Sequence, residues 1–178
     1  MAVDAFLKVV DAQGNTIDGE SFDEFHAKQI EVLTWTFGGT SPSTPGGGGG
    51  GRGAGKVSLH EFTITKNIDK ASPAFFKALV SGSHYKEATL SVRRRQADTQ
   101  DFLKYTLSTV QVTSFNAVGH GEDSEPREVD SVAFAFQKVA IFYKPQIPTG
   151  ALAPTDTTAP ADWTVVSWDL STNSEGGG

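Results

Sequence analysis

The chain has 178 residues, a formal net charge of −6 and no cysteine. A chain of this length can bury a core of one domain, so folding needs neither a disulfide nor a structural metal. The absence of thiols excludes disulfide frameworks and cysteine-ligated zinc, and the acidic balance argues against non-specific binding of nucleic acid.

The first residues, MAVDAFLKVVDAQG, predict a strand and not a secretion signal. Asp4 stands where a signal peptide carries positive charge, and Lys8 and Asp11 interrupt the apolar run. No stretch of the chain is apolar over the length that a membrane-spanning helix needs. We therefore expect assembly in the cytoplasm, no membrane insertion, and export by a route that reads no N-terminal signal.

Alternation of polar and apolar residues with a period of two predicts most of the elements. The clearest strand covers 87–93, where Ala88, Leu90 and Val92 share one face. Four further segments are rich in the apolar, β-branched and aromatic residues that strands prefer: 5–10, 30–37, 57–65 and 163–168.

Two longer runs, 102–115 and 132–143, change phase midway. A phase change inside a strand predicts a bulge or a sharp bend, here near Ser108 and near Gln137. The alternative is that both faces are buried at these points, one of them against another subunit. In either case the sequence predicts a mostly β domain, and strands that are apolar on both faces would indicate that it associates with itself.

One helix is expected at about 72–81. Ser72 is a suitable N-cap, Pro73 fits the first helical position, and Gly82 can end the helix in a left-handed conformation. Three apolar residues fall on one face at helical spacing and are expected to pack on the core: Phe76, Leu79 and Val80.

Three segments are expected to lie outside the core. The loop at 38–56 holds 10 of the 19 glycines and is longer than compact domains usually tolerate. Residues 119–130 form a charged connection between strands, and residues 149–162 are rich in Pro, Thr and Ala, as linkers are.

Within that first loop, residues 50–56 read GGRGAGK and fit the opening of a phosphate-binding loop. The next position is Val57, which has no hydroxyl to bind magnesium, and a strand pattern follows where a phosphate site needs a helix. Consecutive glycines also make such a match easy to obtain. A nucleotide hydrolase that uses Lys56 is therefore a weak alternative.

No other pattern indicates catalysis, a cofactor or a metal ion. His120 and its acidic neighbours are better explained as a solvated turn, and no serine lies in a nucleophile elbow. The remaining charges are candidates for interface contacts or ion pairs within the subunit: Arg93, Arg94, Arg95, Glu122 and Asp123.

Seven strings occur in a fixed order: MAVDAFLKV, HAKQIEVLTWTFG, a glycine-rich loop ending in GAGKV, FTITKNIDKASP, SGSHYKEATLSVRR, HGED and VAFAFQKVAIFYKPQ. Together they cover about residues 1–146, and the order resembles the haemolysin co-regulated protein (Hcp) family, the tube subunit of bacterial type VI secretion. Seven ordered strings are far more specific than the phosphate-loop match.

The resemblance implies a two-sheet, closed or partly closed β-barrel at 1–148 with one flanking helix. Residues 149–178 would add a linker, a strand that docks on the same domain and a frayed end. It implies hexameric rings that stack into a tube behind a VgrG-type spike and inside a contractile sheath, with small effectors in the central hole. It implies no enzymatic activity and no cofactor.

A tail-tube subunit of a phage-like or other contractile machine is the alternative reading, and a monomeric effector-binding adaptor is a less favoured one. The long loop and the long linker depart from the usual family pattern. We expect the loop to reach a neighbouring ring or subunit through these residues: Gly46, Gly47, Gly48, Gly49, Gly50, Gly51, Arg52, Gly53, Ala54, Gly55 and Lys56.

Overall fold

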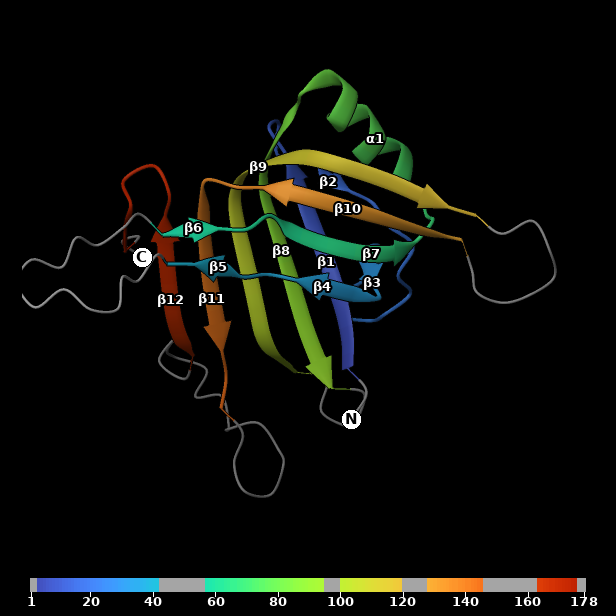
Figure 1. Ribbon diagram of the computed structural model, residues 1–178. Coiled ribbons are helices and arrows are strands. Elements are labelled where there is room, and N and C mark those ends of the chain that lie inside the picture. The colour runs from blue at the N-terminus through green and yellow to red at the C-terminus, as the bar shows by residue number, and fades with distance from the viewer. Residues whose placement is uncertain (1–2, 42–56, 95–99, 120–127, 146–162, 176–178) are drawn as a thin grey trace, which may run out of the picture.

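The computed structural model describes residues 3–41, 57–94, 100–119, 128–145 and 163–175, and all that follows concerns these ranges. They form a mostly β fold with one helix, and every strand pair is antiparallel (Figure 1). The expected fold class is confirmed at this level.

The first layer is built around long strands that run side by side at the back of Figure 1. Its strands, in spatial order, are β1 (Val3–Asp11), β8 (His84–Arg94), β9 (Asp101–Val118), β11 (Lys138–Tyr143), β12 (Thr164–Asp169) and β13 (Ser174–Glu175). On its other edge β1 pairs with β2 (Thr16–Ile17) and β3 (Ile30–Val32).

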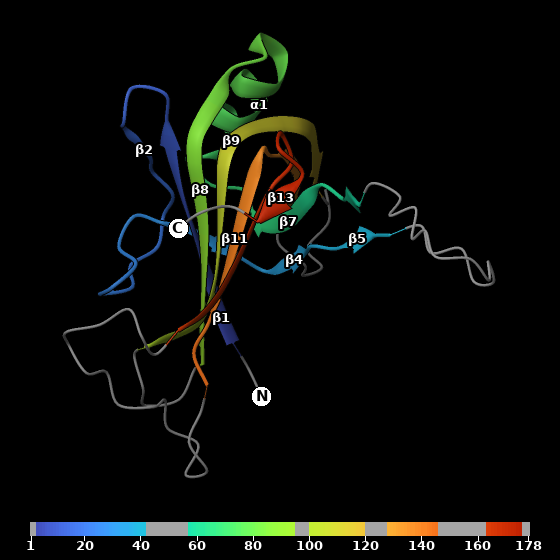
Figure 2. The same cartoon turned by 90° about the vertical axis from the view of Figure 1, so that its left-hand side faces the viewer.

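The second layer crosses the first in front of it and is formed by shorter strands (Figure 1). The second half of β9 pairs with β10 (Val129–Ala135), which pairs with β7 (Phe62–Asn67), which pairs with β4 (Thr34–Thr36). Figure 2 shows β4 and β7 to one side of β1, β8 and β11. A separate two-stranded ladder joins β5 (Gly39–Thr40) to β6 (Ser58–Leu59).

Strand β9 connects the two layers because it bends in the middle. Its first half pairs with β11, and its second half pairs with β10. Thr109, at the junction, has a φ of 52°, a conformation that β-branched residues rarely adopt. The phase change predicted near Ser108 is therefore confirmed as a bend.

The phase change predicted near Gln137 is also a bend. Strand β10 ends at Ala135 and β11 begins at Lys138, so the run expected as one strand is two strands in different layers. The corner is held because the Gln137 N–H donates to the Ser108 carbonyl at 3.0 Å and the Gln137 carbonyl accepts from the Leu170 N–H at 2.9 Å.

Two other segments expected as single strands are also divided. The segment 30–37 breaks at Leu33, because β3 pairs with β1 in the first layer and β4 pairs with β7 in the second. The segment 57–65 divides into β6 and β7. Among the described strands neither sheet closes on itself, so the observed architecture is two packed open layers.

The core lies between the layers and receives alternate residues from each. Fully buried side chains from both layers meet there: Leu7, Val9, Ala88, Leu90, Leu107, Phe62, Ile64, Val132 and Phe134. Phe75 of the helix α1 (Ser72–Ser81) closes one end and contacts the Phe134 ring edge-on, with the centroids 5.5 Å apart.

Helix α1 has the predicted extent, and Gly82 ends it with a φ of 65°. The predicted cap is wrong, however, because Ala71 occupies the N-cap position and the Ser72 side chain is buried. Burial of Ser72 fixes the rotation of the helix, so Phe75 and Ala78 face the core. The predicted packing face is consequently wrong as well: Leu79 packs in part, whereas Phe76 and Val80 are exposed.

A buried polar cluster joins the helix start to the second layer. The Lys66 ammonium donates to Asp69 at 2.6 Å and to the Ser72 hydroxyl at 2.8 Å, and lies 3.1 Å from Asp130. Ser72 donates to the same Asp130 oxygen, while the other Asp130 oxygen is buried without a partner among the described residues. Lys66 therefore supplies the countercharge on which this buried carboxylate depends.

A second set of charges holds the loop at 18–29 on the first layer. Both oxygens of Asp23 accept from the Arg93 guanidinium, and Nε2 of His26 lies 3.0 Å from Asp101. The His26 ring stacks on Phe6 with the centroids 4.4 Å apart. We call Asp23, His26, Arg93 and Asp101 the loop clasp.

The loop clasp lowers the pKa of both of its carboxyl groups. Burial alone raises the pKa of Asp23, but hydrogen bonds from Arg93 and from two backbone N–H groups outweigh it, so the net pKa is lowered. Burial also raises the pKa of Asp101, but the hydrogen bonds and positive charges of His26 and Lys104 outweigh it, so the net pKa lies below its usual value. Both side chains are therefore held as carboxylates.

Replacing Lys66 with Met should destabilise the fold by about 3–5 kcal/mol, because it leaves the buried Asp130 carboxylate without its countercharge. Urea denaturation of the purified variant measures this change. The control is Lys77→Met on the exposed side of α1, which we expect to alter the unfolding free energy by no more than about 0.5 kcal/mol. Equal stability of the two variants would contradict the role given to the cluster.

Stability should decline on acidification through Asp23 and Asp101. Their pKa values are lower in the folded chain than the value of about 3.9 for an unfolded aspartate, so their stabilisation is complete above about pH 5 and is lost as the pH falls through the folded-state values. Between about pH 5 and about pH 3, the melting temperature of Asp101→Asn should fall by less than that of the unsubstituted chain. The melting temperature of the control Asp18→Asn, which alters an exposed residue, should fall as much as that of the unsubstituted chain.

Candidate interaction surfaces

Most of the residues expected to make contacts fall outside the described ranges. These are the whole loop segment Gly46–Lys56, together with Arg95, Glu122 and Asp123. The structure does describe the two ends of that loop, where β5 and β6 pair through Gly39 with Leu59 and Thr40 with Ser58. The chain that follows Lys56 thus enters a strand, as expected, and a phosphate site would need a helix there.

The two arginines that are described make contacts within the subunit. Arg93 belongs to the loop clasp and also lies over the Phe6 ring, with its guanidinium carbon 5.0 Å from the ring centroid. Arg94 lies over the Phe102 ring at 5.6 Å. Arg93 therefore positions the loop at 18–29 by an ion pair and a cation–π contact, and we assign it a positioning role.

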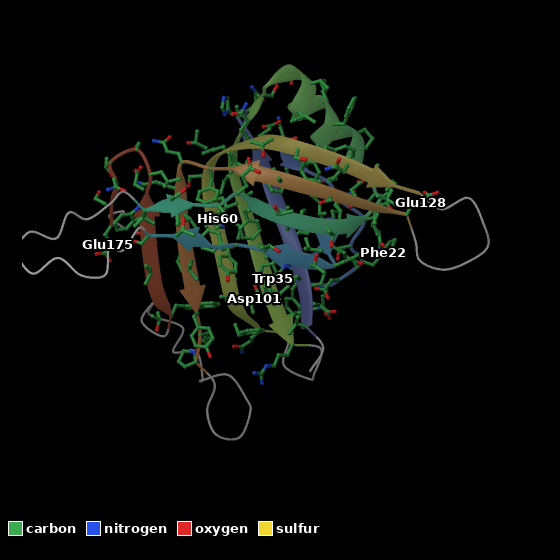
Figure 3. The ribbon with its side chains drawn as sticks, viewed as in Figure 1. Phe22, Trp35, His60, Asp101, Glu128 and Glu175 are labelled. Atoms are coloured by element: carbon green, nitrogen blue, oxygen red, sulfur yellow. The ribbon has the colours of Figure 1, made fainter. Side chains whose placement is uncertain are left out.

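Sequence reasoning missed an aromatic residue in that loop. Phe22 is 99% exposed. Val3 and Leu33, which line a groove together with Phe22, and Phe25, which lies three residues further along the loop, are partly exposed. We call these four residues the Phe22 patch. Figure 3 shows Phe22 projecting from the side of the molecule that carries β3. Four clustered apolar side chains facing water are typical of a contact surface.

A groove with a volume of about 440 Å³ lies beside the Phe22 patch. Val32 and Phe6 contribute apolar lining, and Asp4, Asp23 and Glu31 contribute acidic lining. The groove is therefore suited to an apolar or basic side chain of a partner. Its geometry depends on the loop clasp, because Asp23 and Arg93 form part of its wall.

A second apolar surface lies at the outer edge of the first layer, on β12. Val165 and Val166 are 46% and 56% exposed. One side of β12 pairs with β11 along its length, whereas β13 pairs with the other side only at Trp168 and Asp169. We call Val165, Val166 and the strand that carries them the β12 edge.

Lysines flank the β12 edge on one face of the sheet. The register places Lys104 beside Phe142 and Phe142 beside Val165, and it places Lys138 beside Asp169. The Lys104 and Lys138 side chains are 37% and 45% exposed. Two hydrogen bonds from Ser171 hold the pKa of Asp169 below its usual range, so Asp169 is the ionised partner of Lys138.

A third apolar surface covers the outer side of α1. Phe76 and Val80 are 52% and 67% exposed, and the Phe76 ring contacts Phe115 edge-on with the centroids 6.0 Å apart. Ile68 and Val118 are also partly exposed. Of these side chains, Phe76 and Val80 are the two that were expected to pack on the core.

The described part of the chain contains neither a candidate metal site nor a candidate membrane-spanning helix. No group of three or more His, Asp or Glu side chains within it is arranged to hold a metal ion. Its single helix lacks the length and the apolar character needed to cross a membrane. The three apolar surfaces are thus the features that a functional account must use.

The profile of a protein family described as "Type VI secretion system effector, Hcp" matches residues 6–143. A curated relative, protein hcp1 of Pseudomonas aeruginosa, is 40% identical over 152 residues, which cover 85% of this chain and 89% of the relative. The family match includes the second layer, the helix and the strands of the first layer up to β11, and it ends before β12.

Solved structures agree with this match. A structure described as a type six secretion system protein is 27% identical, with a TM-score of 0.84 over 98% of this chain and all of the other. Hcp1 from Salmonella typhimurium is also 27% identical, with a TM-score of 0.72 over 98% of this chain and 99% of its own. The chain belongs to the Hcp family of the type VI secretion system.

Proposed function

We propose that this chain is the structural subunit of the inner tube of a type VI secretion system, assembled as hexameric rings that stack. The observation that carries the proposal is the family match over residues 6–143, which includes the helix, the second layer and the first layer up to β11. The structural likeness to a type six secretion system protein extends over 98% of the chain and supports the same conclusion.

Ring formation suits the surfaces of the subunit. A closed ring of identical subunits requires each copy to present two different, complementary faces, since the contact is heterologous. The Phe22 patch and the β12 edge are different in shape and lie on different elements, so the subunit carries two candidate faces. A structural role of this kind needs no catalytic residue and no cofactor.

Further parts of the proposal extend the family resemblance. The tube would sit behind a VgrG-type spike and within a contractile sheath, would leave the cell with the machine, and would carry small effectors in its hole. We also propose that residues 1–148 act as a partly closed barrel on which the strand within 149–178 docks. The segment 30–36 supports this, since it pairs with β1 at one end and with β7 at the other.

The purified chain should elute from size-exclusion chromatography with a mass about six times its 18.9 kDa and should show rings in negative-stain images. Light scattering on the same column gives the mass without assumptions about shape. A monomer at high concentration would contradict the tube proposal and favour an effector-binding adaptor.

We propose further that the glycine-rich loop contributes to stacking between rings. The support is its length, its composition and the paired strands β5 and β6 from which it extends. Deletion of residues 44–51 should leave the ring mass unchanged and reduce the number and length of stacked tubes in electron micrographs. Stacking equal to that of the intact chain would reject this role.

A further inference from the structure

The Phe22 patch is exposed to solvent although the loop that carries Phe22 is held firmly on the subunit. Phe22 is 99% exposed, so it contributes nothing to the core of the subunit, yet the loop that carries it is fastened where its two ends meet and again in its middle. At one end Gly19 passes so close to Gln29 that a Cβ atom would lie 2.5 Å from the Gln29 carbonyl oxygen. The loop clasp fastens the rest through Asp23 and His26.

Fastening the loop in this way prepares Phe22 for a contact. A loop whose backbone is already ordered loses little conformational freedom on association, which favours binding through the side chain that it presents. An aromatic residue beside a groove is also the type of residue that carries most of the free energy of an interface. The groove of about 440 Å³ lies directly beside it.

The charges around the two surfaces are complementary. The loop that carries Phe22 exposes three carboxyl side chains and one lysine, and is therefore acidic on balance: Asp18, Glu20, Glu24 and Lys28. The β12 edge is flanked by Lys104 and Lys138, which are 37% and 45% exposed and can accept a second carboxylate partner. Acidic and apolar groups on one surface thus match basic and apolar groups on the other.

The two surfaces also lie on opposite sides of the subunit. Figure 3 places Phe22 at one side and Glu175, in the strand paired with β12, at the other. A heterologous contact that closes a ring joins two such surfaces from successive copies. A contact made by the outer side of α1 would leave both of these surfaces in water.

We propose that the Phe22 patch of one subunit docks on the β12 edge of a second copy of this chain, and that this is a contact within the ring. The inference rests on the proposed function and adds the residues that make the contact. Asp23 and Arg93 act as positioning residues, because their ion pair holds the loop that carries Phe22. Phe22 and Val165 belong to the contact itself.

Replacing Phe22 with Ser tests the contact. Loss of a buried aromatic ring should raise the protein concentration at which half of the chains are in rings by about ten-fold or more. Sedimentation velocity over a dilution series measures this concentration. The melting temperature of the isolated subunit should be unchanged, because Phe22 is 99% exposed.

The matched control is Val80→Ser, which alters the exposed side of α1 and should leave ring formation at its original concentration. If Val80→Ser disrupts the rings while Phe22→Ser does not, α1 makes the contact and the inference is wrong. If the unsubstituted chain forms no rings, the proposed function fails first. These two failures are distinguishable because the unsubstituted chain is measured in the same series.

Cross-linking gives a second, direct test, because the chain has no cysteine of its own. The double variant Phe22→Cys with Val165→Cys, treated with a short bis-maleimide, should give a ladder of covalent oligomers on a denaturing gel. The pair Val80→Cys with Val165→Cys should stay monomeric on the same gel. A ladder from the second pair and none from the first would overturn the proposed contact.

Discussion

The bend in β9 is the constraint on which the rest of the structure depends. One strand supplies the first layer with a partner for β8 and β11 and supplies the second layer with a partner for β10. Strand β9 passes from the first layer to the second at Thr109. The φ of 52° at Thr109 is unfavourable for a β-branched residue and is sustained by the ladders on both sides. Without this bend the apolar faces of the two layers would not meet.

Buried charges then hold α1 and the loop at 18–29, which are not part of the strand ladders. The Lys66 cluster attaches the start of α1 to β10, and the loop clasp attaches the loop at 18–29 to β8 and β9. Each attachment decides what the element exposes. Burial of Ser72 turns Phe76 outward, and the ion pair of Asp23 with Arg93 leaves Phe22 in water. The surfaces available for assembly thus follow from polar contacts inside the subunit.

Local patterns in the sequence are sufficient for the helix, for the longer strands and for the two bends. Gly82 marks the end of α1, and the changes of parity near Ser108 and Gln137 coincide with corners of the fold. The rotation of α1 could not be found in this way, because it depends on Asp130, which is 58 residues from Ser72. The break at Leu33 is equally hidden, since Ile30 to Phe37 is continuous in pattern while its two halves pair in different layers.

The contacts of Arg93 and the exposure of Phe22 could not be predicted from local sequence patterns either. Arg93 stood out as part of a basic run, but its partner Asp23 lies 70 residues away, and nothing local distinguishes that aspartate from its neighbours. Phe22 and Phe25 carry no signal of exposure in the sequence, since an acidic loop with two aromatic residues can fold either inward or outward. Their exposure follows from the loop clasp, whose partners are far apart in the sequence.

Cryo-electron microscopy of the purified chain, at a resolution that traces side chains, tests the central claim most directly. The account predicts a closed ring of six copies in which Phe22 of each subunit is buried against β12 of the next. A ring in which Phe22 and Val165 both face solvent would contradict the contact, and particles that are only single subunits would contradict the tube itself.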